Sequence, residues 1–294
     1  MKNHTDVLIF HTQICAGASQ ICLMADANLI FASAPSRKRS GMEIRMKQKQ
    51  KAVVLSQREA APQIYDMWIG TDLAAQAMPG QFLCIYPRDK STLLPRPIRI
   101  CEVREDRKAL RIVYRVAGRG TGEFSQYRAG DAIDIMGTLG NGFPLEEAAG
   151  RKAFLMGGGI GVPPVLQLAK ELDGEKQIVV GYRDGHTFLR EDLEKYGSVY
   201  IATEDGSAGT KGNVMDAIAE NGLEADIIYA CGPMPMLRAI KAYAAEHHIK
   251  AYISLEEHMA CGVGACLGCV VKTRETDSHS HVNNARICTE GPVF

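Results

Sequence analysis

The sequence has no long hydrophobic run and no surplus of either charge. No apolar stretch reaches the ~18 residues that a membrane-spanning helix needs. The 34 Lys and Arg residues balance the 34 Asp and Glu residues. Proteins that bind nucleic acid through bulk charge are usually basic, so this balance argues against that class. With 46% hydrophobic and 23% charged residues, the composition is typical of a soluble globular protein.

A regular disulfide framework is also missing. Nine cysteines are scattered irregularly, and an odd number is a poor basis for pairing in a chain of this length. Reduced thiols, some of them metal ligands, fit better and indicate a reducing, cytoplasmic compartment. The first apolar run, VLIF at 7–10, is shorter than the roughly 7–15 residues of a signal-peptide core. We expect residues 1–45 to be a disordered or spurious extension before a domain that begins at Met46.

Residues 46–148 have the pattern of a β domain. Short apolar runs such as KAVVLSQ, IYDMWIG, RPIRICEV and ALRIVYRVAG follow one another. Several of them alternate between apolar and polar residues, and Gly, Pro and charged turns separate them. Many short strands at this spacing are typical of an antiparallel barrel or sandwich.

The period of the pattern changes over residues 149–253. Strand-like runs such as KAFLMGGG and QIVVGYR alternate with helical runs such as VPPVLQLAKELD and MPMLRAIKAYAAEHH. This alternation predicts an α/β domain with a parallel sheet covered on both faces. Ligands of such a sheet bind beyond the carboxyl ends of its strands. Residues 254–294 are too few to bury much of a core, so a bound metal centre would have to help order them.

Four cysteines near the end of the chain form the most specific motif. Cys261, Cys266 and Cys269 have the spacing C-x4-C-x2-C, and Cys288 follows in RICTEGP. Plant-type ferredoxins hold a 2Fe–2S cluster with four thiolates at this spacing. The small residues between the cysteines allow a tight loop whose backbone N–H groups point at the cluster sulfurs. Structural zinc, which usually shows paired C-x2–4-C motifs, and unligated thiols are the alternatives.

Two turns at the ends of predicted strands are candidates for binding a nucleotide. Gly157, Gly159 and Gly161, in FLMGGGIGVPP, follow a strand and open a helix. Such a loop lets the backbone approach a pyrophosphate, and the helix N-terminus supplies free N–H groups. An ordinary tight turn is the alternative, because a valine stands at the last Gly position of the usual G-x-G-x-x-G. In the second turn, YACGPMPML, Cys231 beside Gly232 either lines a nicotinamide pocket or is a small buried hydrophobe.

Two motifs in the β domain combine arginines with glycines. They are RPIRI at 96–100 and VYRVAGRGTGEFS at 113–125. Arg96, Arg115 and Arg119 would meet a phosphate or the electron-rich edge of a flavin, and the glycines would present backbone donors to a phosphate. Surface arginines and a hairpin turn are the alternative. No acid–base pair stands out anywhere in the sequence, so we expect no catalytic residue that acts on an organic substrate.

The order of these motifs resembles a known superfamily. R-P-x-x-I, Y-R-x-x-G-x-G-T, G-x-L-G-N-G-F, G-G-G-I-G-x-x-P, C-G-P and a C-terminal cysteine cluster follow one another over about residues 50–294. The series resembles the ferredoxin–NADP reductase superfamily. It is most similar to the electron-transfer subunits of NAD-linked (class 1B) dihydroorotate dehydrogenases. EEHMACGVGACLGCVVKT followed by CTEGPVF is the most specific part of the resemblance.

The resemblance implies an FAD-binding antiparallel β-barrel, an NAD-binding α/β domain and a small C-terminal 2Fe–2S domain. It implies a heterotetramer with an FMN-containing catalytic subunit that oxidises dihydroorotate. Electrons would pass from FMN through 2Fe–2S and FAD to NAD⁺, as a step of de novo pyrimidine (UMP) biosynthesis. The alternatives are an NAD(P)H–ferredoxin or sulfur-reducing oxidoreductase subunit of the same superfamily and, in a different class, a non-enzymatic redox sensor.

The matching motifs also imply which residues hold each cofactor. The flavin would contact Arg96, Pro97, Ile98, Arg99, Val113, Tyr114, Arg115, Gly120 and Thr121, NAD would contact Gly157, Gly159, Gly161, Cys231 and Gly232, and the cluster would be bound by Cys261, Cys266, Cys269 and Cys288.

One residue departs from the family pattern, and one pair of neighbouring residues leaves the choice between NAD and NADP open. The family's flavin motif commonly carries Ser where this chain has Arg99, a long cation that either shifts the flavin potential or points elsewhere. Arg183 favours the 2′-phosphate of NADP and the adjacent Asp184 favours NAD. The expectation of NAD therefore rests on the resemblance.

Overall fold

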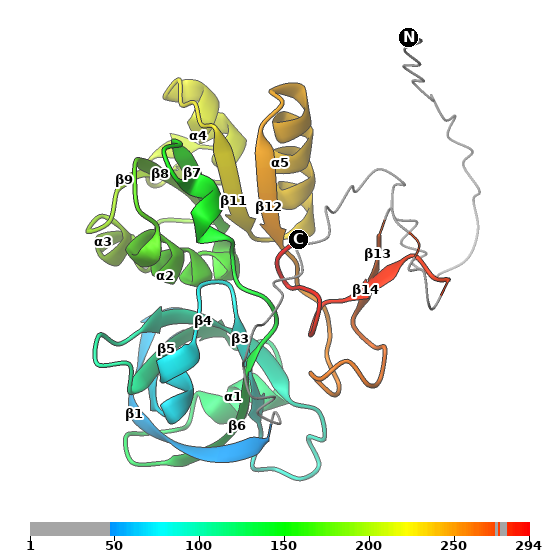
Figure 1. Cartoon of the computed structure of the whole chain (residues 1–294). Helices are drawn as coiled ribbons and strands as arrows, with labels where there is room; N and C mark the ends of the chain where they lie inside the picture. The colour runs from blue at the N-terminus through cyan, green and yellow to red at the C-terminus, as the bar shows by residue number, and fades with distance from the viewer. Residues whose placement is uncertain (1–47, 274–275, 277–280) are drawn as a thin grey trace, which may run out of the picture.

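The structure, a computed structural model, describes residues 48–273, 276 and 281–294. The extension predicted over residues 1–45 lies outside the described residues. Figure 1 shows three parts: a barrel, a sheet flanked by helices, and a short C-terminal region beside both. Among the described residues, no helix is both long and apolar enough to cross a membrane.

The first part is a closed antiparallel barrel with the strand order β1-β2-β5-β4-β3-β6. The alternation predicted for these strands is clear in β1, where Ala52 and Val54 point into the core while Val53 and Leu55 are exposed. A barrel removes the exposed edges that an open sheet would leave. Its strands are β1 (Lys49–Ala61), β2 (Ile64–Gly70), β3 (Phe82–Tyr86), β4 (Arg96–Val103), β5 (Ala109–Arg115) and β6 (Ala132–Leu139).

The segment after β5 is not a hairpin turn, which was the alternative considered for VYRVAGRGTGEFS. It turns into the short helix α1 (Arg119–Phe124). Thr121 fixes this turn, because its Oγ1 accepts hydrogen bonds from the backbone N–H groups of Ala117 at 2.8 Å and Gly118 at 3.3 Å. Two 3-10 turns, η1 (Asp72–Gln76) and η2 (Leu145–Ala148), complete the connections of this region.

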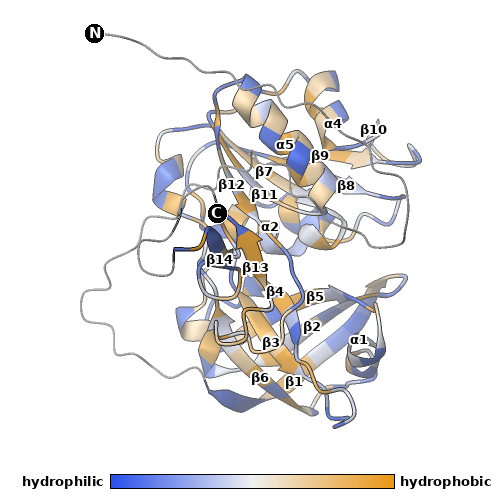
Figure 2. Cartoon of the chain, turned by 90° about the vertical axis from the view of Figure 1, so that its right-hand side faces the viewer, coloured by the Kyte–Doolittle hydropathy of each residue, from blue (hydrophilic) through white to orange (hydrophobic). Residues whose placement is uncertain are grey.

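The second part is a six-stranded parallel sheet with the order β10-β9-β8-β7-β11-β12. Its central strands are apolar and buried throughout, as expected for a sheet covered on both faces. Figure 2 shows hydrophobic residues concentrated along strands and a mixed surface on helices such as α5. The strands are β7 (Ala153–Gly158), β8 (Lys176–Tyr182), β9 (Ser198–Thr203), β10 (Thr210–Lys211), β11 (Ile227–Cys231) and β12 (Lys250–Ser254).

Helices cover the two faces of this sheet. On one face α2 packs on β7 and also reaches β4 of the barrel, and on the other face α4 and α5 pack together. A buried hydrogen bond of 2.6 Å joins the two parts, from the backbone N–H of Val103 to Gln167 Oε1. The helices are α2 (Pro163–Glu171), α3 (Arg190–Leu193), α4 (Val214–Glu220) and α5 (Met234–Glu246), with the 3-10 turn η3 (Gly159–Gly161) before α2.

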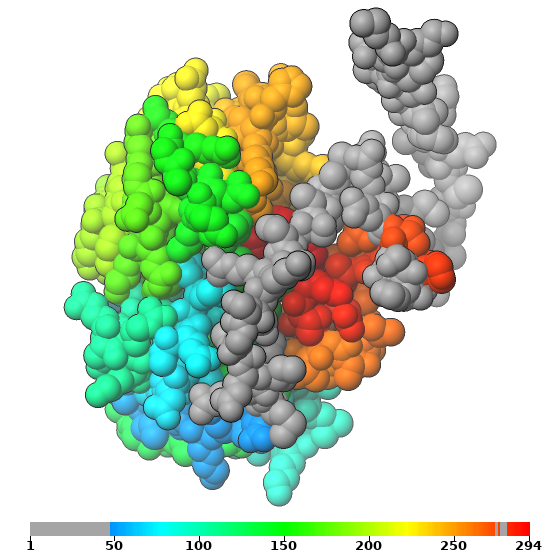
Figure 3. Space-filling model, in the orientation of Figure 1, coloured from blue at the N-terminus to red at the C-terminus, as the bar shows by residue number. Residues whose placement is uncertain are grey.

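The C-terminal part is a loop with one antiparallel pair, β13 (Val270–Lys272) and β14 (Asn284–Arg286). The chain end is tied to the parallel sheet, because Ile253 and Phe294 exchange backbone hydrogen bonds of 2.8 and 3.0 Å. Cys269, Cys288 and Phe294 share one apolar core with residues of both other parts. In Figure 3 this region (orange to red) sits directly against the rest of the molecule. The domain boundaries expected from the sequence, after residues 148 and 253, stay predictions.

Candidate functional site

The glycine loop lies at the carboxyl end of β7, where the chain turns through η3 into α2. Its closest approach is to the neighbouring β11: a Cβ built on Gly161 would lie 2.4 Å from the carbonyl oxygen of Cys231. Any side chain there would push the two strand ends apart, since real Cβ atoms do not come so close. The two turns that the sequence identified separately are therefore packed against each other.

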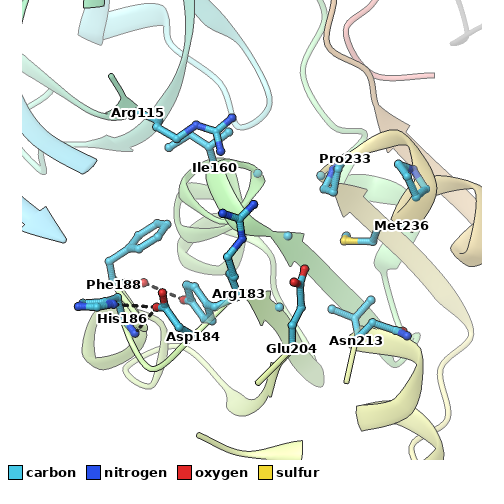
Figure 4. A pocket seen from close by; sticks show the side chains of 18 of the residues that line it. Arg115, Ile160, Arg183, Asp184, His186, Phe188, Glu204, Asn213, Pro233 and Met236 are labelled. Atoms are coloured by element: carbon cyan, nitrogen blue, oxygen red, sulfur yellow. Dashed lines mark hydrogen bonds and ion pairs between the residues drawn. The ribbon is translucent and has the colours of Figure 1, made fainter. Parts of the chain in front are cut away.

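A cavity of about 910 Å³ opens in front of these two turns. Gly159, Gly161 and Gly232 line its floor, and Ile64 and Arg115 line it from the barrel side. Figure 4 shows the side chains that surround it, including Arg183, Glu204, Asn213 and Met236 from the ends of the sheet strands and the helices that follow. Its size and position, beyond the carboxyl ends of parallel strands, suit a dinucleotide.

Asp184 and His186 contact each other among the residues that line this cavity. His186 Nδ1 lies 2.7 Å from Asp184 Oδ1, and the backbone N–H of His186 donates to the same oxygen at 2.9 Å (Figure 4). Both hydrogen bonds lower the pKa of the Asp184 carboxyl, and the one from the backbone N–H has the larger effect. The adjacent Arg183 lines the cavity.

The predicted nucleotide residues differ in their access to the cavity. Gly159, Gly161 and Gly232 line it directly, whereas Gly157 is buried behind them at the end of β7. Cys231 is only 1% exposed and is not part of the lining. Glu204, Asn213 and Glu256 line the cavity and were not among the residues predicted. Their positions after strands were the only available signal, because a single polar residue there carries no motif.

The residues predicted for the flavin differ in how accessible their side chains are. Val113 and Tyr114 are buried in β5, and the Tyr114 hydroxyl donates a hydrogen bond of 2.8 Å to Gln57 inside the molecule. Their side chains support the barrel, so only their backbone can contact a ligand. The group with accessible side chains is Arg96, Pro97, Ile98 and Arg115.

Arg96 lies against the turn that begins α1. A Cβ built on Gly120 would be 2.7 Å from Arg96 Nε, so the glycine leaves room for the guanidinium. The guanidinium also donates to the carbonyl oxygen of Leu94. A positive group beside a glycine-containing turn fits the pyrophosphate of a dinucleotide such as FAD.

Arg99 lies at the junction of all three parts. Its guanidinium forms an ion pair with Glu256 and donates to the carbonyl oxygen of Leu255 at 2.5 Å, and its side chain is only 9% exposed. Burial opposes its charge, but the neighbouring Cys231 thiol and Glu256 carboxylate outweigh burial and raise the pKa of Arg99. Desolvation raises the pKa of the Cys231 thiol to about 11.

The structure brings the four predicted cluster ligands together as free thiols. They form two neighbouring pairs, Cys261 with Cys266 and Cys269 with Cys288, and Cys288 also lies near Cys261. Among the described residues, no three His, Cys, Asp or Glu side chains converge on the position of a single ion.

Backbone donors favour the thiolate of Cys261. Burial opposes this, but the N–H groups of Val263 and Cys266, each 3.4 Å from its sulfur, help to lower the pKa of Cys261 to about 6. Burial, and then the Cys269 thiol, raise the pKa of Cys288 to about 12. Four thiols with N–H groups directed at sulfur have the chemistry that an iron–sulfur cluster requires, so these residues fit the group.

The cysteine loop has a buried side and an open side. Toward the barrel, a Cβ built on Gly262 would lie 3.0 Å from Cys84 Sγ of β3. Toward solvent, Cys266 is exposed, as are the apolar side chains of Val263, Leu267 and Val270. A cluster held here would be close to the barrel on one side and accessible from outside on the other.

The fold and these sites define a ferredoxin–NADP reductase-like protein with an added iron–sulfur region. The chain superposes with a TM-score of 0.73 on a chain of the NADH-dependent reduced ferredoxin–NADP oxidoreductase. The two are 28% identical, and the match covers 83% of this chain and 87% of that one. A ferredoxin reductase of carbazole 1,9a-dioxygenase has the same fold, with a TM-score of 0.60 and 20% identity over 70% of this chain and 68% of that one.

Sequence comparison identifies the particular family. The model for the iron–sulfur cluster binding domain of dihydroorotate dehydrogenase B matches residues 256–294, and the oxidoreductase NAD-binding domain matches residues 155–242. The electron transfer subunit of dihydroorotate dehydrogenase B (NAD(+)) from Streptococcus mutans is 43% identical over 84% of this chain and 96% of its own length. The Bacillus mycoides subunit is also 43% identical, over 85% and 97%. The chain belongs to the family of dihydroorotate dehydrogenase B electron transfer subunits, as the resemblance predicted.

Proposed function

We propose that this chain is the cytoplasmic electron-transfer subunit of an NAD-dependent dihydroorotate dehydrogenase, which takes part in de novo pyrimidine (UMP) biosynthesis. Its cofactors are FAD and a 2Fe–2S cluster, and NAD⁺ is the electron acceptor. One observation carries the proposal. A single chain contains a dinucleotide-sized cavity, four neighbouring thiols and a barrel of the flavin-reductase type that contacts both. The family membership agrees with it.

We assign each cofactor to the residues that fit it. NAD occupies the cavity in front of Gly159, Gly161 and Gly232, with Gly157 and Cys231 behind. Cys261, Cys266, Cys269 and Cys288 bind the cluster. FAD lies along β4 and the turn before α1, in contact with Arg96, Pro97, Ile98, Arg99, Arg115, Gly120, Thr121 and the backbone of Val113 and Tyr114.

Bound FAD supplies the conversion between hydride exchange with a nicotinamide and single-electron exchange with an iron–sulfur cluster. The chain itself provides position and charge. Arg96 and the turn at Gly120 would hold the phosphates, and the close packing of Gly161 on Cys231 would fix the floor of the nicotinamide site. Cys84 and Gly262 bring the cysteine loop against the barrel, which keeps the two redox groups near each other.

The partner is an FMN-containing subunit that oxidises dihydroorotate, and two copies of each subunit form a heterotetramer. The open side of the cysteine loop supports this part of the proposal. Leu267 is 59% exposed, and Val263 and Val270 are 41% and 38% exposed beside Cys266. Exposed apolar groups around a redox centre suit a protein–protein contact through which electrons pass.

Anaerobic reconstitution tests the proposal. The full chain, carrying FAD and cluster, is mixed with the FMN-containing subunit from the same cell, and absorbance of NADH is followed after dihydroorotate is added. We expect NADH to form only when both subunits are present, together with orotate in equal amount. Absence of orotate-linked NADH formation from two cofactor-loaded subunits that form a complex would contradict the proposal.

One observation favours a second function in the same superfamily. The similarity to the NADH-dependent reduced ferredoxin–NADP oxidoreductase extends over 83% of this chain. This share is larger than the 70% that the ferredoxin reductase of carbazole 1,9a-dioxygenase covers. A subunit that exchanges electrons between NAD(P)H and ferredoxin, or with a sulfur-reducing partner, is therefore the alternative. Capture of such a partner from the source cell, with ferredoxin-linked NAD(P)H turnover and no orotate, would favour it.

A further inference from the structure

Arg99 is the buried cation nearest the point where the three parts of the molecule meet. It comes from β4 of the barrel, its ion-pair partner Glu256 opens the cluster-binding segment, and the adjacent Cys231 ends β11 of the sheet. Burying such a charge costs free energy. Glu256 is half exposed and neutralises the guanidinium from one side only.

One member of the Arg99–Glu256 pair, the carboxylate, reaches the dinucleotide cavity. Glu256 lines the cavity together with Gly159 and Gly232, and Arg99 stands directly behind that carboxylate. Its two terminal nitrogens are occupied by Glu256 and the Leu255 carbonyl, whereas its buried Nε makes no hydrogen bond among the described residues. A buried N–H donor without a nitrogen or oxygen acceptor is rare in native proteins. The Cys231 thiol lies beside this guanidinium, and Nε remains available to donate to a ligand atom.

The position along β4 indicates which part of the flavin is near. Arg96, at the start of β4, packs on the Gly120 turn that we assign to the phosphates. The strand then runs to Arg99, where the barrel meets the floor of the nicotinamide site at Cys231. A flavin that extends along β4 from its phosphates therefore places its ring system at Arg99.

We propose that Arg99 tunes the reduction potential of the bound flavin, and that Glu256 is the counter-ion that moderates it. This inference rests on the proposed function and adds the residues that set the driving force of its hydride step. In that step the reduced flavin anion gives a hydride, two electrons with one proton, to NAD⁺, which yields oxidised flavin and NADH. The reduced flavin is more negative than the oxidised one, so a nearby cation stabilises it and raises the potential.

The test is an anaerobic dye titration of the full, FAD-loaded chain, in which the flavin absorbance bands report the midpoint potential. Arg99→Gln keeps hydrogen-bond donors and removes the charge, and it should shift the oxidised-to-reduced ratio by at least about tenfold toward oxidised, or about 30 mV for a two-electron couple. Glu256→Gln should shift the ratio in the opposite direction. Arg99→Lys should restore most of the wild-type potential. Arg104→Gln, which removes an exposed arginine paired with Asp106 outside the cavity, should leave it unchanged.

The opposite signs separate this account from a purely structural role. If the pair only holds the three parts together, breaking it from either side would shift the potential in one direction or leave it unchanged, and either result would overturn the proposal. If Arg99→Gln fails to retain FAD, Glu256→Gln carries the test alone, and the absence of a rise in potential refutes it. Failure of the proposed function would instead appear in the wild-type chain, as absence of FAD or of dihydroorotate-linked NADH formation.

Discussion

The two glycine-containing loops of this protein use glycine for different reasons. In the nucleotide loop, Gly161 is required by proximity, because its missing side chain would occupy the space of the Cys231 carbonyl, 2.4 Å away. In the cysteine loop, Gly264 is required by conformation, with φ of +81°. Gly161 is buried between the ends of two strands, while the cysteine loop has one side open to solvent. A scaffold thus holds the first loop in place, whereas the second depends on its backbone shape and its bound group.

The largest effect should come from removing a cluster ligand. Cys269 is 3% exposed and pairs with Cys288, so Cys269→Ser should abolish the 2Fe–2S cluster and electron transfer to the partner. FAD content and NADH oxidation with an artificial acceptor should persist, because the barrel and cavity do not depend on this thiol. Visible and electron paramagnetic resonance spectra measure the outcome. An intact cluster signal in this variant would refute the ligand assignment.

Within the cluster site, two of the cysteines should differ in thiol reactivity in the cluster-free protein. The pKa of Cys261 is lowered from 9.0 to about 6, and that of Cys288 is raised to about 12. Between pH 6 and 9, Cys261 should therefore be alkylated as a thiolate while Cys288 stays protonated and buried. Labelling with iodoacetamide as a function of pH, read by peptide mass spectrometry, should give a midpoint near pH 6 for Cys261. The same midpoint for both residues would contradict this account.

The same shift predicts how stability depends on pH. A thiol whose pKa is lower in the folded state favours folding above its unfolded value and loses that contribution as the pH falls. The free energy of unfolding of the cluster-free chain should therefore rise between pH 6 and 9 through the Cys261 contribution. Cys261→Ala should flatten this rise in urea unfolding at several pH values, and an unchanged slope would count against the backbone donors as its cause.

Gly161→Ala tests the proximity requirement of the nucleotide loop. Overpacking of this kind costs about 1–3 kcal/mol, and here it would also displace the cavity floor. We expect NADH to reduce the flavin at least roughly tenfold more slowly, while the cluster spectrum stays intact. Gly185→Ala is the matched control in the same domain, because its Cβ would meet only the Ser207 hydroxyl at 3.3 Å. Equal behaviour of the two variants would show that the close approach does not matter.

The smallest effect should distinguish two glycines of the cysteine loop. Gly264→Ala forces a left-handed conformation on a residue with a side chain, which costs about 1–2 kcal/mol. Gly268→Ala should be nearly neutral, since its nearest neighbour is Cys266 Sγ at 3.5 Å. The rate at which the cluster absorbance decays in air should therefore rise for Gly264→Ala only. A similar rise for Gly268→Ala would mean that the loop lacks room for a side chain, whatever its backbone conformation.

These loops also show which features the sequence alone can predict. The cysteine spacing and the alternating strands are local patterns, so neighbouring residues predicted a group of four thiols and an antiparallel β domain. The choice of a barrel over a sandwich came from the family resemblance. The contact of Arg99 with Glu256 joins residues 157 positions apart, and only the assembled fold brings them together. The same holds for Glu204 and Asn213, single polar residues that become cavity walls through the topology of the sheet. Tyr114 shows the opposite case, a motif residue whose side chain is part of the barrel core.

We expect this one chain to couple nicotinamide chemistry to a one-electron centre through its flavin. An anaerobic titration of the isolated, fully loaded chain with NADH tests it most directly, followed by visible absorbance for the flavin and electron paramagnetic resonance for the cluster. We predict that NADH bleaches the flavin and that the signal of the reduced cluster then appears, whereas Cys269→Ser shows only the bleaching. A flavin that NADH does not reduce, or a cluster that NADH reduces in protein stripped of FAD, would contradict the account.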